Sequence, residues 1–340
     1  MEEVSIIGID LAKRSFQVHG ARADGSVAYR RKLSRGKLLG FLASQPPCTV
    51  AMEACASAHY WGREISALGH QVRLVPPIYV KPFVKRQKND AADAEAITEA
   101  AQRPTMHFVA VKTEAQQAQG MLFRTRDLLV GQRTQTINAL RGHLAEFGVV
   151  APQGRARIGQ LAGVIEDGDC GLPMAVVELA RLLLGRIAEL DEKIDGLDRK
   201  IRMSAKENEE TARLMTIPGV GPITALAIQA FAPPMESFRR GRDFSAWLGL
   251  VPRQHTTGGK PRLGRISKMG QRDLRRLLVT GAMAVVQQAS RRREITDPWL
   301  AGMLARKPKK VVAVALANRT ARTVWALATK GETYRVHAAA

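Results

Sequence analysis

The chain has 340 residues, which is enough for two or more domains that each bury a core. Its 52 Lys and Arg residues against 31 Asp and Glu residues give a net charge of +21 and a pI near 10.6. A surplus spread along the whole chain indicates a polyanionic partner, above all a nucleic acid. An anionic membrane surface and a basic surface without a partner are the alternatives.

Other sequence features argue against membrane insertion, secretion and a zinc site. The longest apolar run, Val311–Ala317, has seven residues, whereas a membrane-spanning helix needs about 20. The first ten residues lack the basic and apolar regions of a secretory signal. Cys48, Cys55 and Cys170 have neither the paired spacing nor the ordered histidines of a zinc site. We therefore expect a protein of the reducing cytoplasm.

The first third of the chain has the pattern of an α/β domain. Alternating apolar residues and turn signals predict five short strands, with helical spacing in the segments between the later ones. The predicted strands are Val4–Asp10, Ser15–Ala21, Val27–Lys32, Cys48–Glu53 and Gln71–Val75, and the predicted helices are Lys37–Ser44 and Ala58–Leu68. This order is typical of a mixed sheet covered by helices.

Four acidic residues fall where such domains carry chemistry. Asp10 ends the first predicted strand and Glu53 the fourth, while Asp90 and Asp93 share a face of an alanine-rich helix. A single strand-end acid is more often a turn cap, but the four together have the arrangement of RNase H-like nucleases, which hold two Mg²⁺ ions at a phosphodiester. Gly8–Lys13 also suggests an actin-like ATPase strand, although it lacks the Gly and Ser/Thr that follow there.

The middle of the chain is predicted to be helical. Gln116–Phe147 has the pattern of one long helix, whose basic residues are either solvated or in contact with a phosphate backbone. The expected contacts are Arg124, Arg133 and Arg141. A Gly-rich connection follows at Ala151–Leu172. Strict 4–3 spacing then predicts a coiled coil, or an antiparallel hairpin with the first helix, through Val176, Ala180, Leu183, Ile187, Leu190, Ile194, Leu197 and Ile201.

Two candidate nucleic-acid-binding segments lie in the last third. Ile217–Ala225 (IPGVGPITA) has the pattern of a helix-hairpin-helix, in which Gly219 and Gly221 let backbone N–H groups approach a phosphate, although a plain tight turn also fits. After a predicted helix at Phe244–Leu250, Val251–Gly270 has no room for a regular element. Eleven basic and two acidic residues between positions 239 and 276 indicate a loop that clamps a nucleic-acid backbone. Its expected contacts are Arg253, Lys260, Arg262, Arg265 and Lys268.

These segments together resemble a known family over essentially the whole chain. The carriers are GIDLAK with Asp10, MEACASAHYW with Glu53, KNDAADAE with Asp90 and Asp93, IPGVGPITA, and GLVPRQHTTGGKPRLGRISKMGQRDLRRLL. They are similar to the DEDD-type insertion-sequence transposases, a group that includes the Piv-like DNA invertases and the bridge-RNA-guided, serine-using recombinases. The resemblance implies an α/β plus α fold with three domains. These are an RNase H-like (Holliday-junction-resolvase-like) catalytic domain over 1–108, a helical linker and coiled coil over 109–208, and a transposase domain with a helix-hairpin-helix over 209–335.

The resemblance also implies a reaction and partners. Asp10, Glu53, Asp90 and Asp93 would hold Mg²⁺ or Mn²⁺, and DNA strands would be cut and exchanged through a covalent link to a protein hydroxyl. The implied partners are donor and target DNA, a structured bridge RNA, and further copies of the chain in a homodimer that assembles to a tetramer. The implied location is the bacterial cytoplasm, at the nucleoid when the enzyme is active, without membrane contact.

One position departs from the family. Relatives carry a serine just before the glycine of the segment His255–Gly259, and this serine attacks DNA, whereas the matching residue here is Thr257. Threonine keeps the hydroxyl, but its β-methyl group stiffens and crowds it. Thr257 is therefore a nucleophile, or it marks a slowed or inactive variant, or Thr256 takes its role. Ala56, in the loop after the second acid, also stands where relatives often have glycine.

Two other functions fit the same residues. A metal-dependent junction nuclease would use water as its nucleophile, with the C-terminal region as a binding module, and would cleave DNA without Thr257. A non-catalytic nucleic-acid-binding protein would need neither Asp10 nor Asp93. His255 is expected to contact phosphate or water more than to shuttle a proton.

Overall fold

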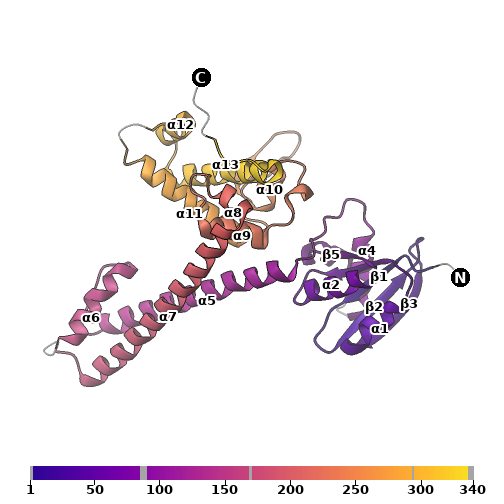
Figure 1. Cartoon of the computed structure of the whole chain (residues 1–340), viewed down its shortest axis with the longest axis horizontal. Coiled ribbons are helices and arrows are strands. Elements are labelled where there is room, and N and C mark those ends of the chain that lie inside the picture. Colours follow the sequence, from indigo (N-terminus) through magenta and orange to yellow (C-terminus); the bar gives the residue numbers. More distant parts are fainter. Residues whose placement is uncertain (1–2, 85–89, 168–170, 293–294, 336–340) are drawn as a thin grey trace. The chain divides into compact units, whose positions relative to one another are not determined.

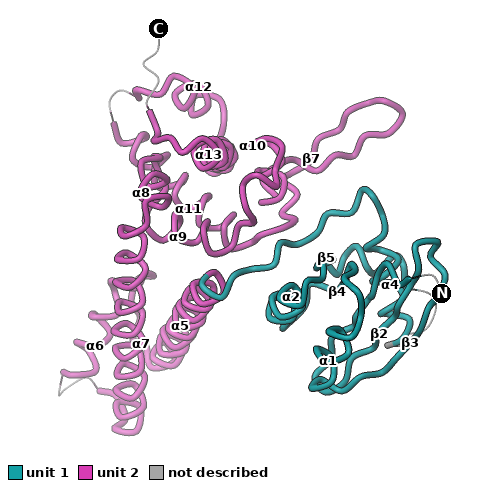
Figure 2. Tube along the Cα trace, turned by 45° about the vertical axis from the view of Figure 1, so that its right-hand side comes forward, with its two compact units in different colours: residues 1–115 teal, residues 116–340 magenta. Residues whose placement is uncertain are grey.

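The computed structural model describes residues 3–84, 90–167, 171–292 and 295–335, without the side chain of Asp90. The chain divides into two compact units, residues 1–115 and 116–340 (Figure 2). Each unit contains hydrophobic cores of its own. Lys85–Asn89, which include the first two residues of the predicted KNDAADAE step, and Cys170 lie outside the described residues.

Unit 1 is built on a five-stranded mixed sheet, as predicted. Its strands are β1 (Ile6–Asp10), β2 (Ser15–Ala21), β3 (Val27–Ser34), β4 (Thr49–Glu53) and β5 (Gln71–Val75), in the order β3-β2-β1-β4-β5. β2 is antiparallel to β1 and β3, whereas β4 runs parallel to both β1 and β5. The carboxyl ends of β1, β4 and β5 therefore meet at one edge of the sheet.

Helices cover both faces of this sheet (Figure 1). They are η1 (Arg35–Lys37), α1 (Leu38–Ala43), α2 (Ala58–Ala67), α3 (Pro77–Val80), η2 (Lys81–Phe83) and α4 (Asp90–Ala101). Alternation along the strands sorts the side chains, because Ile7 and Ile9 pack with α1 and α2, and Ile6 packs with α3 and α4. The result is a three-layer unit with α4 on the face opposite α1 and α2.

Unit 2 begins with two long helices. They are α5 (Glu114–Ala145) and α7 (Met174–Glu207), and between them lie η3 (Arg155–Arg157) and α6 (Ile158–Glu166). The long helix predicted at Gln116–Phe147 is confirmed. The prediction that Ala151–Leu172 is only a connection was wrong, because Ile158, Leu161 and Ile165 have helical spacing and are buried in a core with the C-terminal end of α5.

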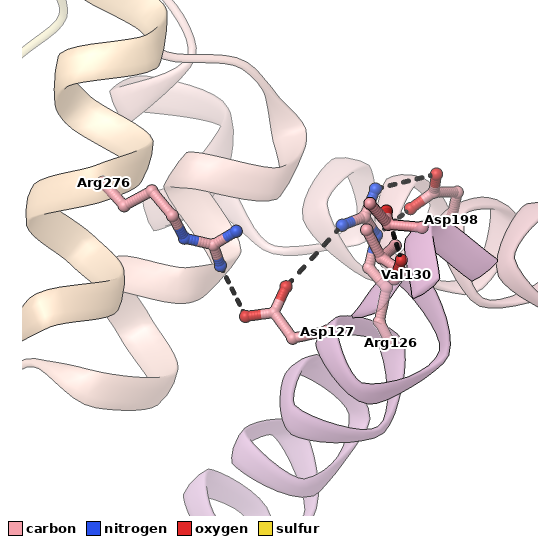
Figure 3. A network of polar contacts seen from close by, with 6 residues as sticks. Arg126, Asp127, Val130, Asp198 and Arg276 are labelled. Carbon is pink, nitrogen blue, oxygen red and sulfur yellow. Dashed lines mark hydrogen bonds and ion pairs between the residues drawn. The ribbon is translucent and has the colours of Figure 1, made fainter. Parts of the chain in front are cut away.

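α5 and α7 run antiparallel and are joined by ion pairs. Arg126 Nε lies 2.5 Å from Asp198 Oδ1, and Arg133 Nη1 lies 2.6 Å from Asp191 Oδ1; Figure 3 shows the first pair. Seven residues separate the two pairs on each helix, so the helices keep one register over two turns. Of the two predicted arrangements, these contacts favour the antiparallel hairpin, in which α7 packs against α5. The predicted apolar seam is wrong at two places, since Val177 and Asp198 are buried whereas Val176 and Leu197 are only half-buried.

The rest of unit 2 is a helical body (Figure 1). Its elements are α8 (Glu209–Leu214), α9 (Pro222–Phe231), η4 (Met235–Ser237), α10 (Gly241–Trp247), α11 (Arg272–Ala289), α12 (Pro298–Arg306) and α13 (Lys309–Lys330). α10 confirms the helix predicted near Phe244–Leu250, with its bounds shifted toward the N-terminus. Arg276 of α11 contacts Asp127 of α5 at 2.5 Å, which links this body to the helical hairpin (Figure 3).

A short β-hairpin joins α10 to α11. β6 (Pro252–Gln254) and β7 (Leu263–Ile266) are antiparallel, with Pro252 opposite Ile266. The prediction that Val251–Gly270 holds no regular element was therefore wrong. Both strands are short and almost entirely exposed, so no alternation of buried and exposed side chains marks them.

Candidate active site

Two of the predicted acids end neighbouring strands of unit 1. β1 and β4 are parallel and pair Ile9 with Met52, so the next residues, Asp10 and Glu53, lie beside each other at the carboxyl edge of the sheet. Both acids are half-buried. This edge, where parallel strands end, is where α/β domains carry their binding sites.

A glycine in β1 brings α4 toward the same edge. A Cβ atom at Gly8 would overlap the hydroxyl of Thr98 and the carbonyl oxygen of Ala94, both on α4. No side chain fits between this strand and this helix, so the two backbones approach closely. Because Gly8 lies two residues before Asp10, and Asp93 precedes Ala94, the contact carries the third predicted acid toward the first two.

The pKa values report how the acids influence one another. Partial burial and then the negative charge of Asp93 raise the pKa of Glu53 above its usual range. Burial, followed by the charges of Glu53 and Asp10, raises the pKa of the Cys55 thiol. Asp93 therefore lies close enough to influence Glu53, and both Glu53 and Asp10 lie close enough to influence Cys55. A positive charge at this strand edge would stabilise the ionised acids.

The donor chemistry of this edge suits a hard divalent cation. Asp10, Glu53 and Asp93 supply carboxylate oxygens, the ligands that Mg²⁺ and Mn²⁺ prefer. Within the described side chains, no three His, Cys, Asp or Glu residues gather closely enough to hold a metal ion. The fourth predicted ligand, Asp90, is the first residue of α4, and its side chain lies outside that description. The acids thus fit a cation by ligand type and by charge.

The second candidate group lies at the tip of the β6–β7 hairpin. Gly258 and Gly259 have φ values of 56° and 74°, the left-handed values that a type I′ turn requires at both central positions. Thr257 and Lys260 flank this turn, and the Lys260 N–H donates to the Thr257 carbonyl at 3.1 Å. Thr256 and Thr257 are exposed, and neither hydroxyl has a hydrogen-bond partner in the described part of the chain.

The base of this hairpin is fixed to the helical body. A Cβ atom at Gly249 or at Gly270 would overlap a backbone carbonyl oxygen. Arg275 of α11 donates from Nη1 to the carbonyl oxygens of Leu248 at 2.9 Å and Met269 at 3.0 Å. The hairpin itself extends away from the helices of unit 2 as a ribbon (Figure 2). An exposed tip is therefore carried on an immobilised base.

Basic side chains follow the ribbon on both strands. The five predicted contacts are all exposed: Arg253, Lys260, Arg262, Arg265 and Lys268. Arg253 also braces the ribbon, because its Nε and Nη2 atoms donate to the Ser267 carbonyl at 3.3 and 3.2 Å. The His255 ring lies beside Gly264, 3.4 Å from the place where a Cβ would stand, so this glycine makes room for it.

The arginines of α5 differ in their environment. Arg133 pairs with Asp191, as described above, and Arg141 donates from Nη2 to two carbonyl oxygens of the loop after α5, at 2.7 and 3.0 Å. Both side chains therefore hold the helical hairpin and its loop together. Arg124, in contrast, is exposed to solvent.

The two glycines between α8 and α9 also differ. Gly219 has a φ of 86°, and a Cβ atom there would stand 2.9 Å from the carbonyl oxygen of Gly281 in α11. Its lack of a side chain thus serves the packing of the turn on α11. Gly221 is exposed and precedes Pro222, the first residue of α9, so its backbone faces solvent at the start of a helix.

Known proteins match the chain from end to end. A probable family 20 transposase of Pseudomonas aeruginosa is 48% identical over 98% of this chain and 99% of its own length. The transposase of insertion sequence element IS1328 from Yersinia enterocolitica is 45% identical over 98% and 99%, and that of IS1111A from Coxiella burnetii is 39% identical over 98% and 92%. Residues 211–296 match the transposase model of the IS116/IS110/IS902 family, and residues 7–148 match a DEDD transposase model of the IS110 group. The chain belongs to the IS116/IS110/IS902 family of transposases.

As an IS110-family transposase, the chain is an enzyme of DNA phosphoryl transfer, and the predicted family resemblance is confirmed. The DEDD match includes the four predicted acids, and such domains generally depend on a divalent metal. The match over 211–296 includes the hairpin that carries Thr257. Among the described helices, none is long and apolar enough to cross a membrane.

Three residues near these groups escaped sequence reasoning. Gly8 could have been found, because an isolated glycine inside a strand pattern signals a close backbone approach. Cys55 could have been noticed from its place two residues after Glu53. Arg275 carries no local signal, since its role depends on two carbonyl groups that the fold brings to it.

Proposed function

We propose that this transposase cuts and exchanges DNA strands at an insertion sequence through a covalent link to Thr257. The observation that carries the proposal is the exposed Thr257 hydroxyl, which flanks a type I′ turn at the tip of a basic ribbon. A hydroxyl held at the end of a narrow ribbon is accessible to a duplex in a way that a hydroxyl in a packed loop is not. Membership of a transposase family supports the reaction class.

The acids of unit 1 form the other half of the proposed chemistry. Asp10, Glu53, Asp90 and Asp93 would hold Mg²⁺ or Mn²⁺, and such a cation lowers the pKa of a hydroxyl and stabilises a leaving alkoxide. Burial and then the charge of Asp93 raise the pKa of Glu53, and a bound cation would offset both effects. The strand order of this unit and its acids at strand ends support an RNase H-like catalytic domain over residues 1–108.

The proposed step exchanges one phosphate ester bond for another. Thr257 Oγ1 attacks phosphorus, the new Oγ1–P bond forms as the P–O3′ bond breaks, and the electron pair of that bond leaves with the 3′ oxygen. The proton of the threonine hydroxyl passes to water or to a nearby base such as His255, and the 3′ oxygen is protonated as it leaves. Attack by another 3′ hydroxyl on the phosphothreonine reverses these changes and joins a new strand pair.

The basic residues have separate proposed roles. Lys260, Arg262, Arg265 and Lys268 would neutralise the scissile and flanking phosphates, with Arg253 bracing the ribbon on which they stand. Gly221 and the start of α9 would receive a backbone phosphate as part of a helix-hairpin-helix. Arg124 would contact the backbone from α5, whereas Arg133 and Arg141 serve the fold.

We also propose that a structured bridge RNA selects the donor and target DNA, and that the chain acts as a homodimer that assembles to a tetramer. The net charge of +21 supports a second polyanion beside DNA. The acids that activate Thr257 would then come from a second copy. Sequencing RNA that copurifies with the protein tests the guide, and light scattering with and without DNA tests the assembly.

The decisive experiment asks whether the protein stays attached to DNA. Purified protein is incubated with insertion-sequence end DNA and Mg²⁺ or Mn²⁺, denatured, and resolved on a gel that detects labelled DNA on the protein. We expect an adduct that is lost in Thr257→Ala and kept in Thr256→Ala, a matched control one residue away. Thr257→Ser should form the adduct at least as fast, because serine lacks the crowding methyl group.

Each alternative has its own outcome. Loss of the adduct in Thr256→Ala alone would move the nucleophile to Thr256. An adduct that forms only in Thr257→Ser would identify the natural chain as an inactive variant. Cleavage without any adduct, unaffected by Thr257→Ala, would replace the proposal with a nuclease that uses water.

A further inference from the structure

The turn between α12 and α13 carries a dense group of positive charges outside the ribbon. Four of the five residues from Arg306 to Lys310 are basic, all five are exposed, and the fifth is Pro308. In the described part of the chain, none of the four side chains forms an ion pair. The arginines that hold unit 2 together differ, since Arg126 and Arg276 each face an aspartate. Residues 306–310 thus form a basic turn.

Two of the four cations of the basic turn lie at the end of a helix where positive charge is unfavourable. α13 has 22 residues, and its first two are Lys309 and Lys310, without an acid in the first turn and without a side-chain cap. The N-terminal end of a helix carries a partial positive charge, so cations there are unfavourable. These lysines therefore do not stabilise α13, and no acid among the described residues forms an ion pair with them.

The backbone of the basic turn is nevertheless fixed. The Lys307 N–H donates to the Met303 carbonyl at 2.9 Å, which closes α12, and the N–H groups of Val311 and Val312 donate to the Pro308 carbonyl at 2.9 and 3.1 Å, which opens α13. Val312 is fully buried beneath the turn. The four charges are thus displayed on a rigid corner and not on a mobile tail.

Hydrogen bonds and an ion pair at the other end of α12 add to this rigidity. Asp297 accepts the N–H groups of Trp299 and Leu300 at 3.0 and 3.2 Å, and its Oδ2 accepts from Arg319 Nη1 at 3.0 Å. The Arg319 guanidinium also lies over the Trp299 ring, 5.1 Å from its centre. α12 is therefore tied to the middle of α13, and the angle between the two helices is held from both ends.

We propose that the basic turn is a docking surface for the phosphate backbone of duplex DNA. The inference rests on the proposed action on DNA and adds a contact separate in sequence from both the ribbon and the α8–α9 turn. A fixed group of unpaired cations neutralises adjacent phosphates without ordering a flexible segment. Contacts to phosphates carry no sequence information, so the surface holds the duplex at any sequence while the chemistry takes place elsewhere.

The test compares two ends of one helix. The double variant Lys309→Gln/Lys310→Gln removes two charges from the start of α13, and Lys330→Gln removes one from its last turn. Binding to a labelled duplex is measured by fluorescence anisotropy across a series of NaCl concentrations. We expect the slope of log K against log[NaCl] to become less steep by about one unit per lost contact in the double variant. The slope should stay unchanged in Lys330→Gln.

Thermal unfolding separates this effect from misfolding. Removing cations from the N-terminal end of α13 should leave the melting temperature of the double variant equal to or above that of the wild type, while DNA affinity falls. Lys309→Arg/Lys310→Arg keeps both charges and should keep the wild-type slope. If the double variant proves poorly folded, Arg306→Gln/Lys307→Gln, on the other side of Pro308, must show the smaller slope instead.

Three results would overturn the proposal. An unchanged salt dependence in the neutralised variants would leave the basic turn without a DNA contact. Weaker binding to a structured RNA or to phosphatidylserine vesicles, with duplex binding intact, would assign the surface to another partner. Failure of the covalent adduct assay would not affect these outcomes, because they measure binding alone, so the two proposals fail separately.

Discussion

At the scale of single residues, the absence of one side chain decides how the acids come together. Gly8 lets α4 lie on β1 at the place where any Cβ atom would overlap Thr98 and Ala94. The acid that follows two residues later, Asp10, and the acid on the helix, Asp93, depend on this approach for their shared position at the strand edge. A residue with no functional group thus controls the geometry of those that have one.

Replacing Gly8 should show how much stability and DNA cleavage depend on the close approach of α4 to β1. Gly8→Ala forces α4 off the sheet, and we expect overpacking to lower the free energy of unfolding by about 1–3 kcal/mol, with loss of DNA cleavage. Gly40→Ala is the matched control, because Gly40 lies in α1 with open space around it, and alanine there should stabilise the helix by about 0.5–1 kcal/mol. Urea denaturation checks both values. Equal stabilities for the two variants would contradict the close approach.

Glu53 should make stability depend on pH and on metal. Its pKa is higher in the folded than in the unfolded protein, so the folded state binds that proton more tightly. The resulting stability is fully present below the ordinary pKa of glutamate and is lost as the pH rises through the raised pKa. Glu53→Gln removes this dependence. The melting temperature of this variant should therefore rise relative to that of the wild type as the pH increases to neutrality.

Divalent metal should reverse the order of the melting temperatures of Glu53→Gln and the wild type. At neutral pH, Mg²⁺ or Mn²⁺ should raise the melting temperature of the wild type and not that of Glu53→Gln, and the increase should fade as the pH falls, because protons compete for the carboxylate. Glu64→Gln, which changes an acid of α2 outside the set of four, should respond to metal like the wild type. Equal increases in Glu53→Gln and the wild type would remove Glu53 from the metal site.

At the scale of elements, the α5–α7 hairpin is held by charges placed inside an apolar seam. Asp198 is 9% exposed and occupies a position of α7 that faces Arg126, whose pKa is raised above all by the hydrogen bond to Asp198. Asp191 forms ion pairs with both Arg133 and Arg155, so the second pair also fastens the loop after α5. Such pairs specify direction and register, because sliding the helices would separate all of them at once.

Breaking the buried pair should weaken unit 2 strongly. Asp198→Ala leaves the Arg126 guanidinium half-buried without its carboxylate, and we expect a loss of about 2–3 kcal/mol, somewhat below the cost for a fully buried pair. Asp195→Ala provides the control, since this exposed acid lies one turn earlier on the same helix. Chemical denaturation monitored by circular dichroism measures both. Similar losses in the two variants would show that Asp198 has no special role.

At the scale of the whole molecule, each unit buries its own apolar residues. The cores of residues 1–115 are formed by the sheet with its helices, and those of residues 116–340 lie in the helical hairpin and the helical body. No core cluster of described residues draws members from both units. A chain built in this way has two independent sources of cooperative stability.

The two units should therefore fold as separate fragments. We expect residues 1–115 and residues 116–340, expressed alone, each to unfold in one cooperative thermal transition. The first fragment contains all four acids and should gain stability from Mn²⁺, whereas the second contains the ribbon and the basic turn and should bind duplex DNA. Differential scanning calorimetry and anisotropy check these outcomes. A fragment without a cooperative transition would show that its core needs the other unit.

Local patterns predicted most of unit 1 and the long helices, because alternation and helical spacing are local properties of the chain. The predictions that failed concern residues with distant partners and elements that are exposed. Asp198 replaces an apolar residue in the α7 seam because Arg126, 72 positions away, faces it. The helix α6 was not predicted because its segment is rich in glycine, which is typical of a connection. The β6–β7 ribbon shows no buried stripe, although the Gly258–Gly259 pair between two extended segments was a usable hairpin signal.

The candidate site was predicted by residue type and by family resemblance, and less by geometry. Strand ends placed Asp10 and Glu53 correctly at one sheet edge. The closeness of Asp93 depends on the Gly8 contact, which joins residues about 90 positions apart. The engagement of Arg133 and Arg141 inside the protein could not be predicted either, because their partners lie on α7 and on an irregular loop.

The interlocked glycines at the base of the ribbon have a consequence for how this protein changes over time. Gly249 and Gly270 seal the junction with the helical body, so residues inserted or deleted near the tip alter the reach of the ribbon without disturbing the helices. Length and tip chemistry are then free to vary independently of folding. The exposed residues beside the turn, Thr257 among them, are positions at which such an arm tolerates substitution.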